Sequence, residues 1–267
     1  MSNPIFRRIS RLADEQGVRA FVVGGYVRDH FLRRPSTDID VVVVGSGIAL
    51  AEALGSELHA KVSVFKTFGT AMLRHKGVEV EFVGARRESY TQDSRKPQVE
   101  AGTLEDDQRR RDFTINAMAY NDKNGLIDAF DGVGDLERGV IRCVGCAMER
   151  FSEDALRMLR AVRFAAQLGF DIEAETKEAM VKLAPDIAKI SAERIQTELV
   201  KLITSAHPGE IRTAWETGLT AVFLPEFDRM MATPQNTKHH CYSVGEHTVA
   251  ALEHIVGDKV QIGRAHV

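Results

Sequence analysis

The stretch FVVGGYVRDHFLRRPSTDIDVVVVG at residues 21–45 predicts a strand, a tight turn, a short helix, a loop and a second strand. The apolar run that begins at Phe21 ends at Gly24 and Gly25, and glycine lets the backbone turn sharply and approach a ligand closely. Residues 26–32 are expected to form the helix, whose free N–H groups face the turn and favour phosphate. The order of these features predicts a phosphate-binding turn.

Two aspartates, Asp38 and Asp40, open the second strand of this stretch. Side chains alternate along a strand, so both carboxylates share one face, and the valines at 41–44 suit a buried strand. Their mutual repulsion is costly unless a cation neutralises it. Mg²⁺ usually binds one or two carboxylates together with substrate phosphates. The pair therefore predicts a Mg²⁺ site for phosphoryl transfer, and the simpler alternative is a helix cap or a surface ion pair.

These residues carry a resemblance. GGYVRD followed by DIDVVVVG resembles the head motif of the bacterial-type (class II) tRNA nucleotidyltransferase and poly(A) polymerase family. Three later segments resemble further motifs of that family, RRDFTINA at 110–117, DAFDGVGDLERGVIR at 128–142 and EDALRMLRAVRF at 153–164. The resemblance implies an α+β fold, with a nucleotidyltransferase (polymerase-beta-like) head containing a small mixed sheet, followed by an all-helical neck and a partial body.

The implied domains are a catalytic head at residues 1–145, a neck at 146–206 that recognises the nucleotide base, and a partial helical body at 207–267. His239, His240 and His247 resemble the opening of an HD-type phosphohydrolase domain, but one histidine cannot build that metal site, so we assign His247 no metal role. The last six residues, IGRAHV, break the helical pattern. We therefore expect a truncated reading frame with a non-native tail.

A third carboxylate is expected on a neighbouring strand. Glu79 and Glu81 alternate onto one face of the run at 77–83, and a solvated strand face would explain both. The resemblance favours Glu81, with Arg86 five residues on, and implies that Glu81 accepts a proton.

The segment at 110–117 is expected to bind the nucleotide. Paired arginines can hold phosphate by bidentate hydrogen bonds, and Asp112 can accept hydrogen bonds from ribose hydroxyls. The alternative is an ordinary surface helix start. The resemblance implies that Asp112 selects ribose and that the triphosphate and nucleotide contacts are Gly24, Gly25, Arg28, Arg111 and Asn116.

Residues 153–168 predict one strong helix with an apolar face. Solvated salt bridges are the usual explanation of charges on the opposite face. The resemblance implies instead that this face serves the nucleotide, with Asp154 and Arg157 recognising the base and Glu153 orienting them. The charged face carries Glu153, Asp154, Arg157, Arg160 and Arg163.

Asp154 and Arg157 are three residues apart and are expected to project from one helix face. Arginine donates to ring and carbonyl acceptors, whereas aspartate accepts from an exocyclic amino group. Cytosine and adenine both carry an amino group beside a ring nitrogen acceptor. One such pair would accept C and A and reject U and G.

Other segments give local predictions. Asn3 and Pro4 predict the start of a first helix. The short strand-like runs at 61–65, 69–75 and 77–83 imply antiparallel pairs. The polar residues at 86–102 predict a mobile loop.

The composition is that of an ordinary globular protein, with 44% hydrophobic and 27% charged residues. A net charge of −3 does not mark a nucleic-acid binder, although a local basic surface is enough to grip RNA. Cys143, Cys146 and Cys241 fit a reducing compartment, and without a second pair we assign the Cys143-x-x-Cys146 spacing no metal or redox role. No apolar run approaches the ~20 residues of a membrane helix, so we expect a cytoplasmic protein.

The resemblance implies Mg²⁺-dependent, template-independent transfer of CMP and AMP from CTP and ATP to the 3′ end of a tRNA. Poly(A) polymerase, or an enzyme that adds only CC or only A, is the nearest alternative because the motifs of the family overlap. The neck motif argues against a small-molecule nucleotidyltransferase. The intact carboxylates argue against a non-catalytic RNA-binding protein.

Overall fold

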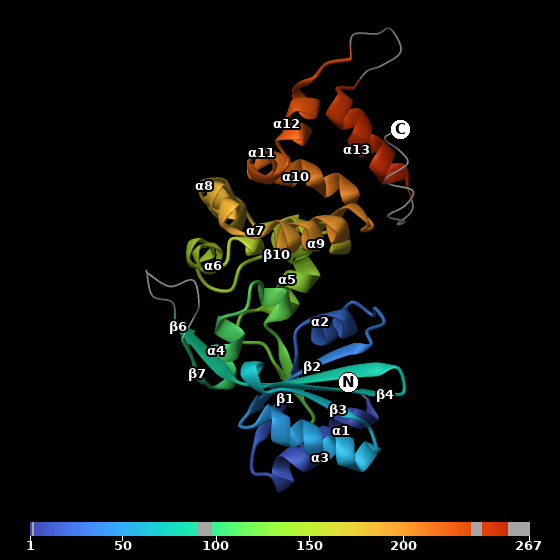
Figure 1. Cartoon of the computed structure of the whole chain (residues 1–267), viewed down its shortest axis with the longest axis vertical. Coiled ribbons are helices and arrows are strands. Elements are labelled where there is room, and N and C mark those ends of the chain that lie inside the picture. Colours follow the sequence, from blue (N-terminus) through green and yellow to red (C-terminus); the bar gives the residue numbers. More distant parts are fainter. Residues whose placement is uncertain (2, 90–97, 236–241, 256–267) are drawn as a thin grey trace. The chain divides into compact units, whose positions relative to one another are not determined.

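The computed structural model describes residues 1, 3–89, 98–235 and 242–255. Contacts within the chain divide it into two compact units, Met1–Arg138 and Gly139–Val267 (Figure 1). Among the described residues, no helix is long and apolar enough to cross a membrane.

A mixed sheet forms the centre of the first unit. Its seven strands lie in the order β3 (Val62–Phe65), β4 (Thr70–His75), β5 (Val78–Gly84), β2 (Asp38–Val44), β1 (Arg19–Val23), β8 (Ala119–Asn121) and β9 (Gly125–Ile127). β2 and β5 pair in parallel, and the other neighbouring strands pair antiparallel. The predicted antiparallel pairing of the three short runs is therefore confirmed.

Helices cover both faces of this sheet (Figure 1). One face packs against α1 (Pro4–Glu15) and α3 (Gly47–Leu58), and the other carries α2 (Gly25–Phe31) and α4 (Leu104–Arg109). A further helix, α5 (Gly132–Arg138), ends the unit. As predicted, Asn3 caps α1 by accepting a hydrogen bond from the Ile5 N–H at 3.1 Å.

The two faces of β2 separate core from site. Ile39 and Val43 lie on the face that α1 and α3 cover, and both are at most 1% exposed. Asp38 and Asp40 lie on the opposite face and remain exposed, as the alternation predicted. Val42 lies on the same face as the two aspartates and packs in a second hydrophobic core with Leu104 of α4. The carboxylates therefore stand at the exposed end of a strand whose other residues are buried or, at Val44, partly buried.

Residues 86–102, predicted as a mobile loop, contain an antiparallel hairpin of β6 (Arg86–Ser89) and β7 (Gln98–Ala101). That prediction was wrong for both strands. The N–H of Gly102 donates to the carbonyl of Ala85 at 2.9 Å and ties the hairpin to the end of β5. Polar composition hid the pairing because a strand ladder is held by backbone groups that every residue carries. Residues 90–97 lie outside the described part.

The second unit is mainly helical, and its described part contains one parallel pair of short strands, β10 (Val140–Ile141) and β11 (Asp171–Ile172). β10 falls within the last residues of the predicted head, and β11 falls within the predicted neck. Its helices are α6 (Ala147–Glu153), α7 (Leu156–Leu168), α8 (Ala174–Leu183), α9 (Ala192–Ile203), α10 (Ile211–Glu216), α11 (Leu219–Phe223), α12 (Pro225–Ala232) and α13 (Val244–His254).

The helix predicted over residues 153–168 is broken at Asp154, so the prediction of one helix was wrong. Asp154 has an extended backbone, with φ −150° and ψ 102°, between α6 and α7. Its side chain accepts from the Leu156 N–H at 3.2 Å, and its carbonyl accepts from the Arg157 N–H at 3.0 Å. Aspartate competes for backbone donors in this way and thereby starts a helix rather than continuing one.

Some predictions fall outside the described residues, namely those on His239, His240, Cys241 and the tail at 262–267. His247 lies on α13. Cys143 is buried and Cys146 is exposed.

Candidate active site

The turn at Gly24 brings predicted site residues together in the first unit. Gly24 has a φ of 70°, which favours glycine. A β-carbon here would lie 3.1 Å from Nη1 of Arg111 and 3.5 Å from Oδ2 of Asp40. Because there is no side chain, an arginine and a carboxylate both approach the turn. α2 begins at Gly25, so the free N–H groups of its first turn lie at the same place.

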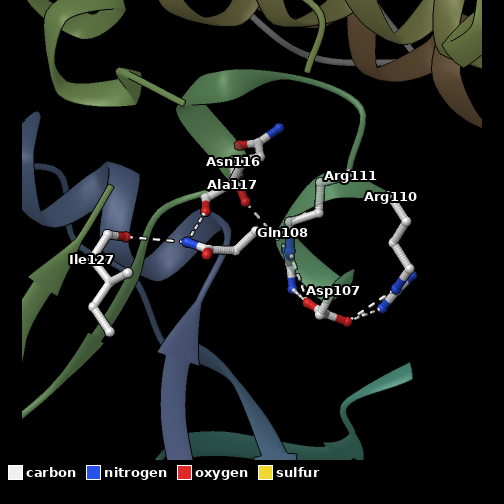
Figure 2. A network of polar contacts seen from close by, with 7 residues as sticks. All are labelled: Asp107, Gln108, Arg110, Arg111, Asn116, Ala117 and Ile127. Carbon is white, nitrogen blue, oxygen red and sulfur yellow. Dashed lines mark hydrogen bonds and ion pairs between the residues drawn. The ribbon is translucent and has the colours of Figure 1, made fainter. Parts of the chain in front are cut away.

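Asp107, which the sequence analysis gave no role, organises the arginines of the site (Figure 2). Its carboxylate is fully buried. Oδ2 accepts from Nε and Nη2 of Arg111 at 3.2 and 3.0 Å, and Oδ1 accepts from Nε of Arg110 at 3.0 Å. Spacings of three and four residues bring both arginines, which directly follow the last residue of α4, back beside the aspartate. That spacing is visible in the sequence and was the signal that could have identified Asp107.

The loop that carries the RRDFTINA segment is fixed by side chain to backbone hydrogen bonds (Figure 2). Nη1 of Arg111 donates to the carbonyl of Asn116 at 3.3 Å. The buried Gln108 donates from Nε2 to the carbonyls of Ala117 at 2.7 Å and Ile127 at 3.1 Å. Arg111 is therefore held by the Asp107 carboxylate before the loop and by the Asn116 carbonyl near the end of the loop.

Asn116 connects Arg28 to Asp112. Its Oδ1 accepts from Nη1 of Arg28 at 2.8 Å, and its Nδ2 donates to Oδ1 of Asp112 at 3.2 Å. The same Asp112 oxygen accepts from the Phe113 N–H at 2.8 Å, while Nε of Arg28 donates to Asp29 at 2.9 Å. Three predicted nucleotide-binding residues from distant segments thus form one network.

The carboxylates line up across two parallel strands. Asp40 of β2 stands opposite Glu81 of β5, and Asp38 stands opposite Glu79. Glu79 is engaged in an ion pair with Arg74 at 2.5 Å. Because Glu81 faces Asp40 and Glu79 has its own cation, the geometry favours Glu81 as the third carboxylate of the site.

The pKa of Asp40 is raised above its ordinary value. Loss of hydration is the main cause, Asp38 and Asp107 add to the rise as like charges, and Arg111 opposes it. Asp40 keeps an exposed surface, but its acidic neighbours act in the same direction as the loss of hydration. A cation bound beside Asp38 and Asp40 would relieve this repulsion.

The pKa of Glu81 is also raised, first by loss of hydration and then by Asp40 and Glu79, while Arg86 lowers it. A carboxyl with a raised pKa is a better proton acceptor near neutral pH. The paired oxygen donors of Asp38 and Asp40 suit Mg²⁺, which takes its remaining ligands from phosphates and water. Within the described ranges, no three or more His, Cys, Asp or Glu side chains are already gathered as a metal site.

In the second unit, Glu153 holds Arg157. Oε2 of Glu153 accepts from Nη1 of Arg157 at 2.6 Å, and the same nitrogen donates to the Arg150 carbonyl at 3.0 Å. Oε1 of Glu153 pairs with Nη2 of Arg150 at 2.5 Å. The three side chains are at most 16% exposed, so this arrangement fixes the Arg157 guanidinium in one orientation.

Asp154 has a different partner. Its Oδ2 pairs with Nη2 of Arg194 in α9 at 2.7 Å. The prediction that Asp154 and Arg157 project from one helix face was wrong, because Asp154 precedes α7 with extended backbone. Arg194 lies 40 residues away in the sequence, and no local pattern pointed to it.

Arg160 and Arg163 do not share an open polar face. Arg163 is 6% exposed, donates from Nε to Oε2 of Glu198 at 2.7 Å, and lies 3.6 Å from the ring centre of Phe164. Arg160 is 3.7 Å from the other Glu198 oxygen. Glu198 of α9 thus offsets both charges, and Arg163 serves the packing of α7 on α9.

The mixed sheet with its parallel β2–β5 pair, the glycine turn after β1 and the helices on both faces form a fold of the nucleotidyltransferase type. Residues 20–142 match the family model described as poly A polymerase head domain. Residues 169–231 match the model described as probable RNA and SrmB-binding site of polymerase A. The chain belongs to the bacterial-type tRNA nucleotidyltransferase and poly(A) polymerase family.

Curated relatives and solved structures support this family membership. The chain is 43% identical over 199 residues to the CCA-adding enzyme of Leuconostoc mesenteroides subsp. mesenteroides, covering 74% of this chain and 49% of that enzyme. It resembles the Bacillus stearothermophilus CCA-adding enzyme in complex with CTP, with TM-score 0.70, 36% identity and coverage of 83% of this chain and 54% of that one.

A tRNA nucleotidyltransferase complexed with a primer tRNA and an incoming ATP analog also matches, with TM-score 0.70, 32% identity and coverage of 84% and 66% of the two chains. The chain spans about half the length of the curated relatives it matches.

Proposed function

We propose that this chain carries the transfer centre of a CCA-adding tRNA nucleotidyltransferase, which moves CMP and AMP from CTP and ATP to the 3′ end of tRNA. The observation that carries the proposal is the position of Gly24 beside Asp40 and Arg111, where a carboxylate and a cation meet at the glycine turn that opens α2. Relatives solved with CTP, and with tRNA and an ATP analog, support the choice of substrates. We place the protein in the cytoplasm, whose reducing conditions suit the three cysteines of the sequence.

In the first unit, Arg111 donates to the triphosphate while Asp107 holds its guanidinium in place. Asp38 and Asp40 would hold Mg²⁺, which when bound neutralises phosphate charge and polarises the phosphoryl group. The RNA 3′-hydroxyl attacks the α-phosphorus, Glu81 accepts the hydroxyl proton, and pyrophosphate leaves. The raised pKa of Glu81 supports its role as proton acceptor.

Asp112, anchored by Asn116, accepts hydrogen bonds from the ribose hydroxyls. In the second unit, Arg157 donates to base acceptors while Glu153 fixes its orientation, and Asp154 accepts from the amino group of cytosine or adenine. Side chains thereby select C and A, and no nucleic-acid template is needed.

The test is incubation of the chain with tRNA lacking its 3′ end, and separately with oligo(A), in the presence of Mg²⁺ and each labelled nucleotide. Addition of C, C and A to the tRNA, and nothing more, is the expected result. A long A tail on oligo(A) would assign a poly(A) polymerase, and a product ending after CC, or only A, would assign an enzyme with that restricted activity. No incorporation into either RNA by folded protein would contradict the proposal.

A further inference from the structure

The residues at 59–78, which form β3, β4 and their flanking turns, contain no carboxylate. The same segment carries Lys61, Lys66, Arg74 and Lys76, although the whole chain has a net charge of −3. Arg74 is paired with Glu79 of β5, so the three lysines supply the net positive charge of this surface. β3 is an edge strand of the seven-stranded sheet, so this positive charge lies along one side of the first unit. A local concentration of cations is what contact with a phosphate backbone requires.

Two aromatic rings are exposed in the same segment. Phe65 at the end of β3 is 47% exposed, and Phe68 in the following turn is 71% exposed. Lysines on an edge strand often prevent the strand from pairing with another molecule. That purpose alone does not explain exposed aromatic rings. Rings set among cations are typical of surfaces that bind single-stranded nucleic acid, since bases stack on the rings while cations contact phosphates.

The sheet register connects this edge to the carboxylates. Asp40 stands opposite Glu81, Glu81 opposite Met72, and Met72 opposite Ser63 of β3. Residues opposite one another share a face, and Phe65, two residues beyond Ser63, lies on that face as well. Met72 and Ser63 are only partly buried. Three strand spacings, roughly 14 Å, separate the catalytic strand from the edge, a span that a few extended nucleotides can cover.

We propose that the β3–β4 edge surface, residues 61–76, binds the single-stranded RNA immediately 5′ of the reacting 3′-hydroxyl. Phe65 and Phe68 stack on bases, and Lys61 and Lys66 contact phosphates. This inference rests on the proposed function, because the occupant is the RNA that the carboxylates extend. A second copy of the chain is a poorer occupant, since an identical edge would bring like charges together.

The test compares the wild-type chain with the double variant Phe65→Ser, Phe68→Ser. Leu126→Ser is the matched control, because Leu126 is 37% exposed on β9 at the opposite edge of the sheet. In single-turnover CMP incorporation, the RNA concentration for half-maximal rate should rise by about tenfold or more in the double variant. The CTP concentration for half-maximal rate should not change, and the control should match wild type. Circular dichroism checks folding, and Lys66→Gln gives a second variant that should also weaken RNA binding.

Photo-crosslinking separates this inference from the proposed function. RNA carrying 4-thiouridine near its 3′ end is irradiated with the wild-type chain, and the crosslinked peptides are identified by mass spectrometry. Crosslinks within residues 61–76 are expected. If the wild type extends RNA but the double variant binds it normally and no crosslink falls in 61–76, the edge-surface inference is wrong and the proposed function stands. If crosslinks fall there but no RNA is extended, the proposed function fails while the binding surface remains. Self-association of Lys66→Gln with unchanged RNA binding would assign the lysines to edge protection and overturn the inference.

Discussion

At Asp40, the proposed role as a metal ligand and the stability of the fold make opposite demands. Its pKa in the folded protein is raised above the ordinary 3.8, so the folded state binds a proton more tightly than the unfolded chain. The free energy of unfolding therefore falls as pH rises from about 3.8 through the raised value, and this loss persists at neutral pH. Asp40→Asn removes the cost.

We expect Asp40→Asn to abolish incorporation and to raise the melting temperature at pH 7 in EDTA, with the gain shrinking as pH approaches about 4. Calorimetry across this pH range measures the melting temperatures. Glu52→Gln, at an exposed carboxylate on α3, is the control. Asp38→Ala should also abolish incorporation while the protein stays folded. Normal turnover by either aspartate variant at saturating Mg²⁺ would show that these carboxylates do not hold the metal.

Asp112 offers a test of sugar selection. It is 9% exposed and is anchored through Asn116 and the Phe113 N–H. Asp112→Ala should raise the use of dCTP relative to CTP by about tenfold, because a lost hydrogen bond in a buried site costs about 1–3 kcal/mol. Single-turnover rates with both nucleotides measure the ratio, and Asn116→Ala should shift it in the same direction. An unchanged ratio would leave Asp112 a structural role only.

Arg157 offers the corresponding test of base selection. A good bidentate base contact is worth roughly 1–3 kcal/mol, so Arg157→Ala should lower selection for CTP and ATP over UTP and GTP by one to two orders of magnitude. Arg194→Ala, which removes the partner of Asp154, should weaken selection too. Single-turnover incorporation of all four nucleotides measures this, with the exposed Lys201→Ala on α9 as control. Equal loss with all four would mean that Arg157 serves the triphosphate or the fold.

At the scale of elements, the short helix α4 places the buried carboxylate of Asp107 beside Arg110 and Arg111. Asp107→Asn should lower the free energy of unfolding by about 3 kcal/mol, because two arginines lose a buried carboxylate. It should also weaken CTP binding, since Arg111 is then less firmly held. Glu105→Gln on the same helix, an exposed carboxylate, should change stability by less than about 1 kcal/mol. Urea denaturation and CTP titration of both variants test the difference, and equal effects would remove the special role of Asp107.

Elements whose signals are local were predictable from the sequence. Asn3 and the following proline start α1, and period-two alternation puts Asp38 and Asp40 on one face. The failures involve partners distant along the chain. Helical periodicity placed Arg163 on a polar face, but it cannot tell that Glu198, 35 residues away, covers that face. The β6–β7 hairpin failed for the same reason, since its ladder gives no local side-chain signal.

The candidate site shows the same division. Motifs identified Arg28, Arg111 and Asp112, and the structure brings them together around Asn116 and Gly24. Asp107 was missed because a run of acids before arginines also describes an ordinary helix start. Only burial distinguishes a structural carboxylate from a solvated one, and burial depends on the packed sheet.

For the molecule as a whole, the net charge is negative, whereas the charge of one local segment is positive. The chain carries −3 overall, yet the segment at 59–78 has four lysine or arginine residues and no carboxylate. For single-stranded RNA, each phosphate that a cation neutralises contributes about −0.7 to the slope of log affinity against log salt. If an oligonucleotide binds through the edge surface, its slope should be no steeper than about −3.

The double variant Lys61→Gln, Lys66→Gln should reduce the magnitude of that slope by about 1.4, because two phosphate contacts are lost. The double variant Phe65→Ser, Phe68→Ser should instead lower affinity at every salt concentration and leave the slope unchanged, since stacking releases no counterions. Fluorescence anisotropy with a labelled oligonucleotide at several salt concentrations measures both effects. Arg7→Gln, an exposed cation on α1, should change neither quantity. A lysine variant with the wild-type slope would show that the overall field of the protein, rather than the cations of this edge, governs its encounter with RNA.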